Sequence, residues 1–472
     1  MENPQYWLTR LIFQKALAGT YLIAFAIAFN QARPLIGENG LHPIRVFLNY
    51  VRFWDAPSLF WINSSDQALF FLSALGLALA SFALTGLSEN FGLWVSMLTW
   101  ASLWLVYLSF VNVGQVFWGF GWETLLLETG FLAIFFGSRD IAPPTLVVWL
   151  LRWVLFRIMF GAGMIKLRGD SCWRDLTCMV YHYETQPLPN PVSWYLHRLP
   201  VWFHKMEVLF THFVEIIVPF GYFWPQKLRW FAGILTIFFQ FSLIVSGNLS
   251  WLNYITIVLA ISCFDDAFFQ KFIPVSIPTD LERMAWFHNG VIGLLTLLIA
   301  YLSIKPVRNL LSQNQMMNTS FDPLHLVNTY GAFGSITRTR YEVILEGTSE
   351  IGPDAKWLEY EFKGKPGDVN RRPCVVSPYH YKLDWQMWFA AMSSYYDHPW
   401  ILGLVQKLLK NDPDILSLMG PNPFPEKAPL YIRAELYEYH FTKNSDNKAW
   451  WERKRVAAYL PPLSLDQLKS EE

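Results

Sequence analysis

About nine apolar segments in the first 304 residues are each close to the length of a membrane-crossing helix. A bilayer core of about 30 Å needs about 20 helical residues. The segments lie at 11–29, 68–87, 91–112, 119–137, 144–165, 203–223, 230–247, 249–264 and 285–304, the eighth being the shortest. Hydrophobic residues make up 53% of the chain and charged residues 16%. This composition and segment length predict a polytopic α-helical membrane protein.

The composition changes after residue 304, and no further run of transmembrane length follows. Apolar side chains alternate with charges at 341–346, 357–362 and 430–441, which predicts strands. Residues 384–395 and 399–410 have the spacing of amphipathic helices. We therefore expect a multi-helix transmembrane domain at 1–304 followed by a soluble, β-rich α+β domain at 305–472.

The loop at about 166–205, between the fifth and sixth apolar segments, is unusually rich in aromatic and ionisable side chains. We expect it to be folded and exported, because a simple connection needs only polar residues. Aromatic side chains supply contact area to exposed apolar surface of a folding protein, and charges add polar contacts. An interfacial aromatic belt is an alternative. The candidate binding residues are Arg168, Trp173, Arg174, Asp175, Tyr181, His182, Tyr183 and Glu184.

Two of the four cysteines, Cys172 and Cys178, belong to this loop. They can bridge if the five residues between them bend. An exported loop favours a disulfide, whereas two buried free thiols are the alternative.

Ionisable residues within the apolar segments form a second group of candidates. Glu123 and Glu128 in the fourth segment share a spacing of five with Arg152 and Arg157 in the fifth. Antiparallel neighbours would align them as two ion pairs. Such pairs either fix the register of the helices or line a polar cavity for a headgroup or substrate.

Candidates for catalysis are few. His212 and Glu215 lie three residues apart, on one face of a helix, and a desolvated lysine such as Lys166 acts as a base near neutral pH. Hydrogen-bonded packing is the alternative for the His212–Glu215 pair. The chain has no HExxH, GxGxxG, P-loop or GxSxG motif, so we predict no metal and no cofactor. Lys plus Arg equal Asp plus Glu at 37 each, which does not favour a nucleic-acid partner.

Several long blocks of mixed composition resemble the lipase maturation factor family. CWRDLTC at 172–178 is followed by YHYETQPLPNP at 181–191. Further blocks are NQARPLIGENGL at 30–41, GFGWETLLLE at 119–128, VSGNLSWLNY at 245–254, NTYGAFGSITRTRYEVILEG at 328–347, RRPCVVSPYHYKLDWQMWFAAM at 371–392 and YLPPLSLDQL at 459–468. The resemblance is colinear and nearly full-length.

This resemblance implies a non-enzymatic, chaperone-like membrane protein that assists the folding of exported proteins, lipases in particular. Its partners would be an exported lipase-like client and the bilayer. It implies the endoplasmic reticulum membrane in a eukaryote and the inner or cell membrane in a bacterium. The loop and the C-terminal domain would meet the client.

Two other hypotheses stay open. The family is distantly similar to the membrane region of vitamin K-dependent carboxylases, which suggests an intramembrane enzyme acting on a lipid or quinone-like substrate, with Lys166, His212 and Glu215 as candidate catalytic residues. A redox role for Cys172 and Cys178 is the third hypothesis.

Overall fold

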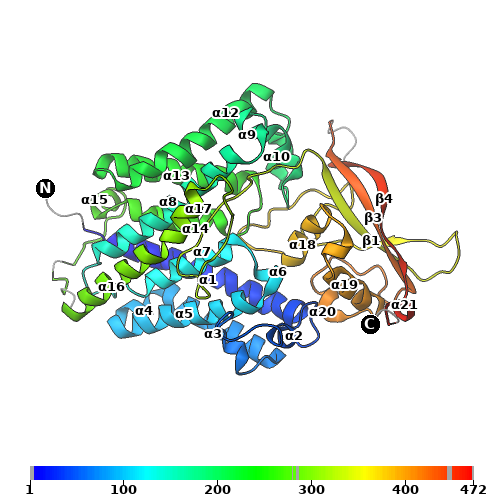
Figure 1. The fold of residues 1–472 in the computed structure, drawn as a ribbon, viewed down its shortest axis with the longest axis horizontal. Helices are drawn as coiled ribbons and strands as arrows, with labels where there is room; N and C mark the ends of the chain where they lie inside the picture. The colour runs from blue at the N-terminus through cyan, green and yellow to red at the C-terminus, as the bar shows by residue number, and fades with distance from the viewer. Residues whose placement is uncertain (1–4, 279, 283–285, 444–448, 470–472) are drawn as a thin grey trace.

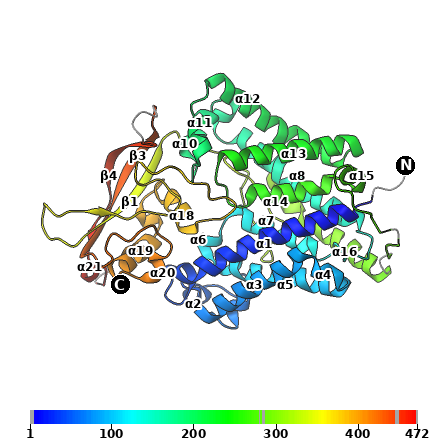
Figure 2. The same cartoon turned by 180° about the vertical axis from the view of Figure 1, so that it is seen from behind.

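The computed structural model describes residues 5–278, 280–282, 286–443 and 449–469 (Figures 1 and 2). Within these residues, seven helical spans are long and apolar enough to cross a membrane. They are α1 (Trp7–Ile36), α3 (Asp66–Thr85), α5 (Leu93–Val113), α8 (Thr145–Arg168), the span Val201–Phe223, α13 (Gln226–Ser246) and the span Trp286–Leu311. The chain is an integral membrane protein, as the apolar segments predicted.

Two of the spans are built from more than one helix. Val201–Phe223 consists of α12 (Val201–His212), a π-helical turn η2 (Phe213–Ile217) and a 3-10 turn η3 (Val218–Phe223). The π turn precedes Pro219, which has no N–H to continue the helical ladder. Trp286–Leu311 consists of α16 (Trp286–Leu302) and α17 (Ile304–Leu311). The domain boundary predicted after residue 304 falls at the start of α17.

The fourth and eighth predicted segments form shorter helices than expected. They are α7 (Gly121–Ala133) and α14 (Leu252–Ala260), which continues into a 3-10 turn η4 (Ile261–Cys263). The 13 residues of α7 rise only about 20 Å. Almost all side chains of α7 are buried, so protein rather than lipid surrounds this short helix.

An apolar outer face marks α13 as a lipid-facing helix. Phe231, Ile234, Phe238 and Phe241 recur at helical spacing and each is about half exposed. Soluble proteins rarely leave such a continuous apolar stripe uncovered.

Close packing of aromatic rings against a glycine joins α1, α3 and α5. A Cβ added at Gly76 would lie 2.3 Å from the ring of Phe25. On its other side Phe25 meets Tyr107 edge to face, with ring centroids 5.3 Å apart. Gly76 therefore lets α3 approach α1 at the distance that small residues permit in membrane bundles.

Shorter helices connect the long ones. The connections in the membrane region are α2 (Ile44–Leu48), η1 (Leu59–Trp61), α4 (Leu87–Asn90), α6 (Gln115–Trp118) and α15 (Asp266–Phe269). The loop after α8 contains α9 (Ser171–Arg174), α10 (Met179–Thr185) and α11 (Pro191–Leu196). It is folded, and it lies at the end of the bundle that faces the sheet (Figure 1).

The C-terminal region contains a four-stranded antiparallel sheet in the order β2-β1-β3-β4. The strands are β1 (Arg340–Thr348), β2 (Leu358–Glu359), β3 (Tyr431–Phe441) and β4 (Trp451–Leu463). Val343 of β1 lies opposite Leu436 of β3. The helices are α18 (Lys382–Ala390), η5 (Tyr395–Asp397), α19 (Trp400–Leu409), α20 (Pro413–Leu416) and α21 (Leu465–Lys469). The predicted combination of membrane helices with a C-terminal sheet and helices is confirmed.

The sequence did not predict β4. This strand occupies an edge of the sheet and carries a run of charges and a Pro-Pro pair. Both features are tolerated on edge strands because one side of the strand needs no ladder hydrogen bonds.

The sheet and the N-terminus lie at opposite ends of the molecule, and α18 lies between the sheet and the membrane helices (Figures 1 and 2). Gln31 of α1 binds the backbone at both His380 and Lys382, with distances of 2.7 and 3.0 Å. The C-terminal region is therefore hydrogen-bonded directly to the membrane bundle.

Candidate functional site

A cavity of about 540 Å³ lies where the membrane helices, the loop and α18 meet. Its walls come from α7, α8, α12, η2, α13 and α14. Its remaining lining includes residues of the loop, residues 317, 318 and 330–337, and α18. The volume is in the range of small-molecule sites. Four sequence-predicted residues line it, namely Lys166, Trp173, His182 and Glu215.

The charged part of the lining is a buried ion pair. Lys166, in the last turn of α8, places its Nζ 2.6 and 2.7 Å from the two carboxylate oxygens of Glu215. Glu215 lies in the π turn η2, and such turns often occur at functional sites. The indole ring of Trp173 lies 5.3 Å from the same Nζ. While this pair is closed, the lysine is an ion-pair partner rather than a free base.

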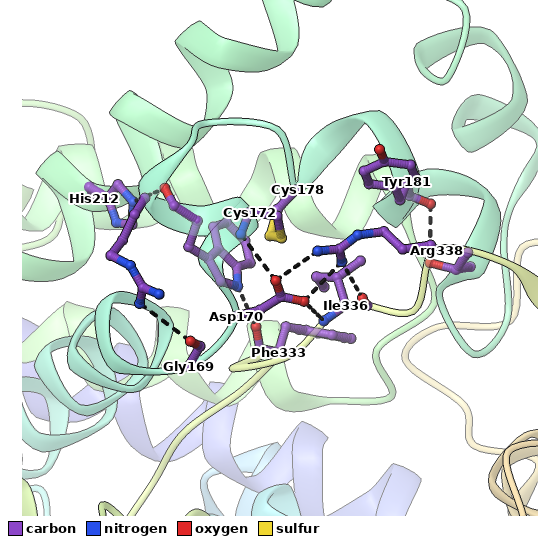
Figure 3. The surroundings of a disulfide bond; sticks show 12 residues. Gly169, Asp170, Cys172, Cys178, Tyr181, His212, Phe333, Ile336 and Arg338 are labelled. Carbon is purple, nitrogen blue, oxygen red and sulfur yellow. Dashed lines mark hydrogen bonds and ion pairs between the residues drawn. A yellow bond between two sulfur atoms is a disulfide. The ribbon is translucent and has the colours of Figure 1, made fainter. Parts of the chain in front are cut away.

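His212 does not join this pair. Its Nε2 lies 3.0 Å from the backbone oxygen of Trp173, and its ring packs against the indole of the same residue (Figure 3). The helical spacing that placed His212 near Glu215 assumed a regular helix, whereas the structure has a π turn directly after His212. His212 therefore helps to hold the loop.

The loop begins with a disulfide between Cys172 and Cys178 (Figure 3). The segment between them turns back, because Thr177 and Cys178 both donate to the backbone oxygen of Cys172 at 2.8 and 3.2 Å. Leu176 adopts a φ of 60° to make this bend. Both cysteines are buried.

A carboxylate at the start of the loop joins it to the chain that precedes the sheet. Asp170 accepts the backbone N–H of Cys172 at 3.0 Å and two bonds from the Arg338 guanidinium at 2.7 and 2.8 Å (Figure 3). Hydrogen bonds from Arg338 lower the pKa of the Asp170 carboxyl to about 2. The Arg338 guanidinium also lies 5.0 Å from the ring of Tyr181.

The other candidate binding residues divide into exposed and buried ones. Arg174 and Asp175 are exposed, and Arg168 is half-buried with bonds to Leu310 and Gln315. Tyr183 is buried and donates to Glu207 at 2.5 Å. The exposed part of the predicted surface is therefore smaller than the sequence pattern indicated.

Buried polar contacts join the loop to the sheet. Arg340 of β1 donates to the backbone oxygens of Glu184, Gln186 and Pro187, and to the carboxylate of Glu342. Arg340 is only 1% exposed. The carboxylate of Glu184 accepts the backbone N–H of Phe441 in β3 at 2.7 Å. The loop and the sheet thus form one continuous surface.

A histidine at this junction is expected to make it depend on pH. His440 lies 3.1 Å from Glu184 and 2.9 Å from Glu438. Burial lowers the pKa of His440, but hydrogen bonds and charge attraction from the two carboxylates outweigh burial and raise it above 6.5. A raised pKa stabilises the junction below the unfolded pKa, and this contribution is lost as pH rises through the folded pKa.

We therefore expect hydrogen exchange in residues 181–190 to become faster between pH 6 and pH 8, after correction for intrinsic exchange. The variant His440→Gln should lose this difference. An unchanged pH difference in that variant would show that another group controls the junction.

Two of the four predicted intramembrane charges, Arg157 and Glu128, form an ion pair with each other. An antiparallel register with a shared spacing of five would instead set Glu128 opposite Arg152 and Glu123 opposite Arg157. The carboxylate of Glu128 also accepts from the Tyr330 hydroxyl at 2.6 Å and from the backbone and amide of Asn328, each at 3.1 Å. Residues that follow the last membrane span therefore complete this buried site.

Among the described residues, Glu123 pairs with neither arginine. Its carboxylate accepts from Lys382 of α18 at 2.7 Å and from the hydroxyl of Tyr107. Arg152 donates instead to the backbone oxygen of Ser262 at 2.8 Å and to the Tyr6 hydroxyl at 3.0 Å. The shared spacing of five therefore identified buried charges but not their partners, and the lysine that binds Glu123 comes from a distant part of the sequence.

Metal ligands are not grouped in the described residues: no three His, Cys, Asp or Glu side chains there are arranged to hold an ion.

Sequence reasoning missed Arg340, Lys382 and Asn253, a buried residue of α14 that lines the cavity. The signal for the first two was a basic residue one or two positions before a predicted strand or helix with a buried face.

Comparison with known proteins confirms the resemblance seen in the sequence. The family model for the lipase maturation factor transmembrane domain matches residues 8–271, and that for the lipase maturation factor C-terminal domain matches residues 326–461. Lipase maturation factor 1 of Homo sapiens is 46% identical, over 99% of this chain and 90% of its own length. Lipase maturation factor 2 of Xenopus laevis is 30% identical, over 98% of this chain and 83% of its own length. No solved structure matches. From its membrane helices to its C-terminal sheet, the chain belongs to the lipase maturation factor family.

Proposed function

We propose that this protein is a membrane-bound maturation factor that assists the folding of exported lipases in a chaperone-like way. Membership of the family supports the lipase client, since the similar relatives are named as lipase maturation factors. The same membership supports a place in the endoplasmic reticulum membrane of a eukaryotic host, or in the cell membrane of a bacterial one.

The observation that carries the proposal is the joining of the loop to the sheet. Arg340 and Glu184 hold the two together through buried hydrogen bonds. A client can then contact loop and sheet at once. Arg174, Asp175 and Tyr195 are among the exposed loop side chains that could make such contacts.

Charge reversal on the exposed loop tests this proposal. In cells lacking their own maturation factor, a dimeric lipase is co-expressed with the Arg174→Glu variant, and secreted lipase activity is measured per amount of lipase made. We expect a loss of at least about fivefold, as for a residue at the centre of a contact surface.

The matched control is Lys227→Glu, an exposed residue where α13 begins, at the other end of that helix from the loop. It should leave lipase secretion unchanged. Equal secretion with the two variants, with both proteins present in equal amounts, would remove the loop from the client surface.

An intramembrane enzyme is the second candidate function. The Lys166–Glu215 pair on the wall of the cavity favours it. Against it, Glu123, Glu128, Arg152 and Arg157 bind protein groups and do not line the cavity. The maturation role is therefore the better supported one.

A further inference from the structure

We propose that the cavity between the membrane helices, the loop and α18 binds a neutral lipid through one apolar chain and an acceptor oxygen, such as the ester oxygen of a monoacylglycerol. This proposal does not rest on the lipase role. It rests on an unpaired polar group, the charge and the position of the cavity.

A buried donor of the lining points to an acceptor on the ligand. Asn253 of α14 is 1% exposed, and its Nδ2 has no hydrogen-bond partner among the described residues. A buried donor left unpaired is destabilising, so a ligand that brings an acceptor oxygen stabilises this amide.

The rest of the lining is mostly apolar, and its charged side chains sum to no net charge. Ile158 and Met159 of α8 and Phe239 and Leu243 of α13 contribute hydrocarbon and aromatic surface. Lys166 and Glu215 neutralise each other. Burial, together with the charge of Lys166, lowers the pKa of His182 to about 4, so this ring is neutral at physiological pH. An anionic or cationic headgroup would therefore find no unpaired opposite charge among the described lining residues.

The type of hydrogen-bonding group that is left unpaired in the lining distinguishes a lipid ligand from a peptide ligand. An inserted peptide would bring a backbone N–H for nearly every carbonyl and would need acceptors as well as donors. The unpaired lining atom that is fully buried, Nδ2 of Asn253, is a donor. Four of the wall elements, α8, η2, α13 and α14, belong to the membrane bundle, where lipid is the surrounding medium. A chain with one or two acceptor oxygens fits this lining better than a peptide.

Photolabelling of the full-length protein tests the inference. The protein, purified in detergent, is irradiated with a monoacylglycerol that carries a diazirine in its acyl chain, and labelled peptides are identified by mass spectrometry. We expect labels on α8, α13 and α14. Ala162→Phe places a ring in the cavity and should reduce labelling about tenfold.

Two further variants keep the result interpretable. Ala78→Phe, on the exposed face of α3, is the matched control and should label like the unchanged protein. Asn253→Leu removes the donor and keeps the number and branching of side-chain heavy atoms. It should weaken labelling by the ester probe about fivefold and leave labelling by an oxygen-free diazirine hydrocarbon unchanged.

Equal labelling of the Ala162→Phe and Ala78→Phe proteins, or labels confined to the outer faces of the helices, would overturn the proposal. Labelling of the cavity by a photoreactive apolar peptide and not by the lipid would assign the site to a peptide, and would overturn it as well.

Discussion

Replacement of Lys382 by methionine is expected to destabilise the protein by about 3–5 kcal/mol, the cost of breaking a buried ion pair from one side. Lys382 and Glu123 are both fully buried, and their charged atoms lie 2.7 Å apart. The lysine also donates to the backbone oxygen of Phe117 at 3.0 Å. Without this lysine, the Glu123 carboxylate loses its cationic partner and still accepts from the Tyr107 hydroxyl. Thermal unfolding of the purified protein in detergent measures the loss, and limited proteolysis reports whether the C-terminal region separates from the bundle.

A double variant distinguishes the cost of an unpaired buried carboxylate from the cost of losing the packing contacts of the lysine side chain. Glu123→Gln combined with Lys382→Met removes both charges, and we expect it to be clearly more stable than Lys382→Met alone. Lys410→Met, at an exposed position after α19, should change stability by less than about 0.5 kcal/mol. A double variant as unstable as the single one would mean that packing, and not charge, explains the loss.

Replacement of Arg340 by methionine is expected to release the loop from the sheet, with a loss of about 3 kcal/mol or more. One guanidinium satisfies the backbone oxygens of Glu184, Gln186 and Pro187, and methionine leaves all three without that donor. Glu342 keeps Lys365 at 2.9 Å, so the strand itself retains an ion pair. Hydrogen exchange in residues 184–190 should accelerate strongly. Under the proposed function, secreted lipase activity should fall in parallel.

Arg338→Met is the matched control for Arg340. Arg338 also binds the loop, through Asp170, but its side chain is 42% exposed. An exposed ion pair contributes little, so we expect a change below about 1 kcal/mol. Similar acceleration of exchange in the two variants would contradict the special role given to the buried arginine.

The sequence was most informative where a single physical length or period controls the structure. Bilayer thickness sets the length of an apolar helix, which is why all nine predicted segments correspond to helices, seven of them in spans of full length. The same rule could not show that α7 and α14 are shorter, because burial inside protein removes the need to span the hydrocarbon. Strands β1 and β3 followed from alternation, whereas the charged edge strand β4 did not.

The candidate site was predicted less completely, because its contacts join distant parts of the chain. Lys166 and Glu215 were both named as candidates, but their ion pair depends on a π turn that composition does not reveal. The partner of Glu123 comes from α18, 259 residues later. Aromatic residues of the loop were taken as surface, although Trp173 and Tyr183 are buried. A pattern of residue types does not show whether a ring faces solvent or another segment.

The ties between the bundle and the end of the chain affect the order in which the protein can mature. Lys382, Asn328 and Tyr330 are made after all the membrane helices, yet they complete the hydrogen bonding of Glu123 and Glu128 inside the bundle. Before these residues are synthesised, Glu123 and Glu128 lack some of their hydrogen-bond partners. A chain that ends after residue 304 would therefore leave both carboxylates without these partners, so the folding of the membrane bundle is completed by residues from the carboxy-terminal region.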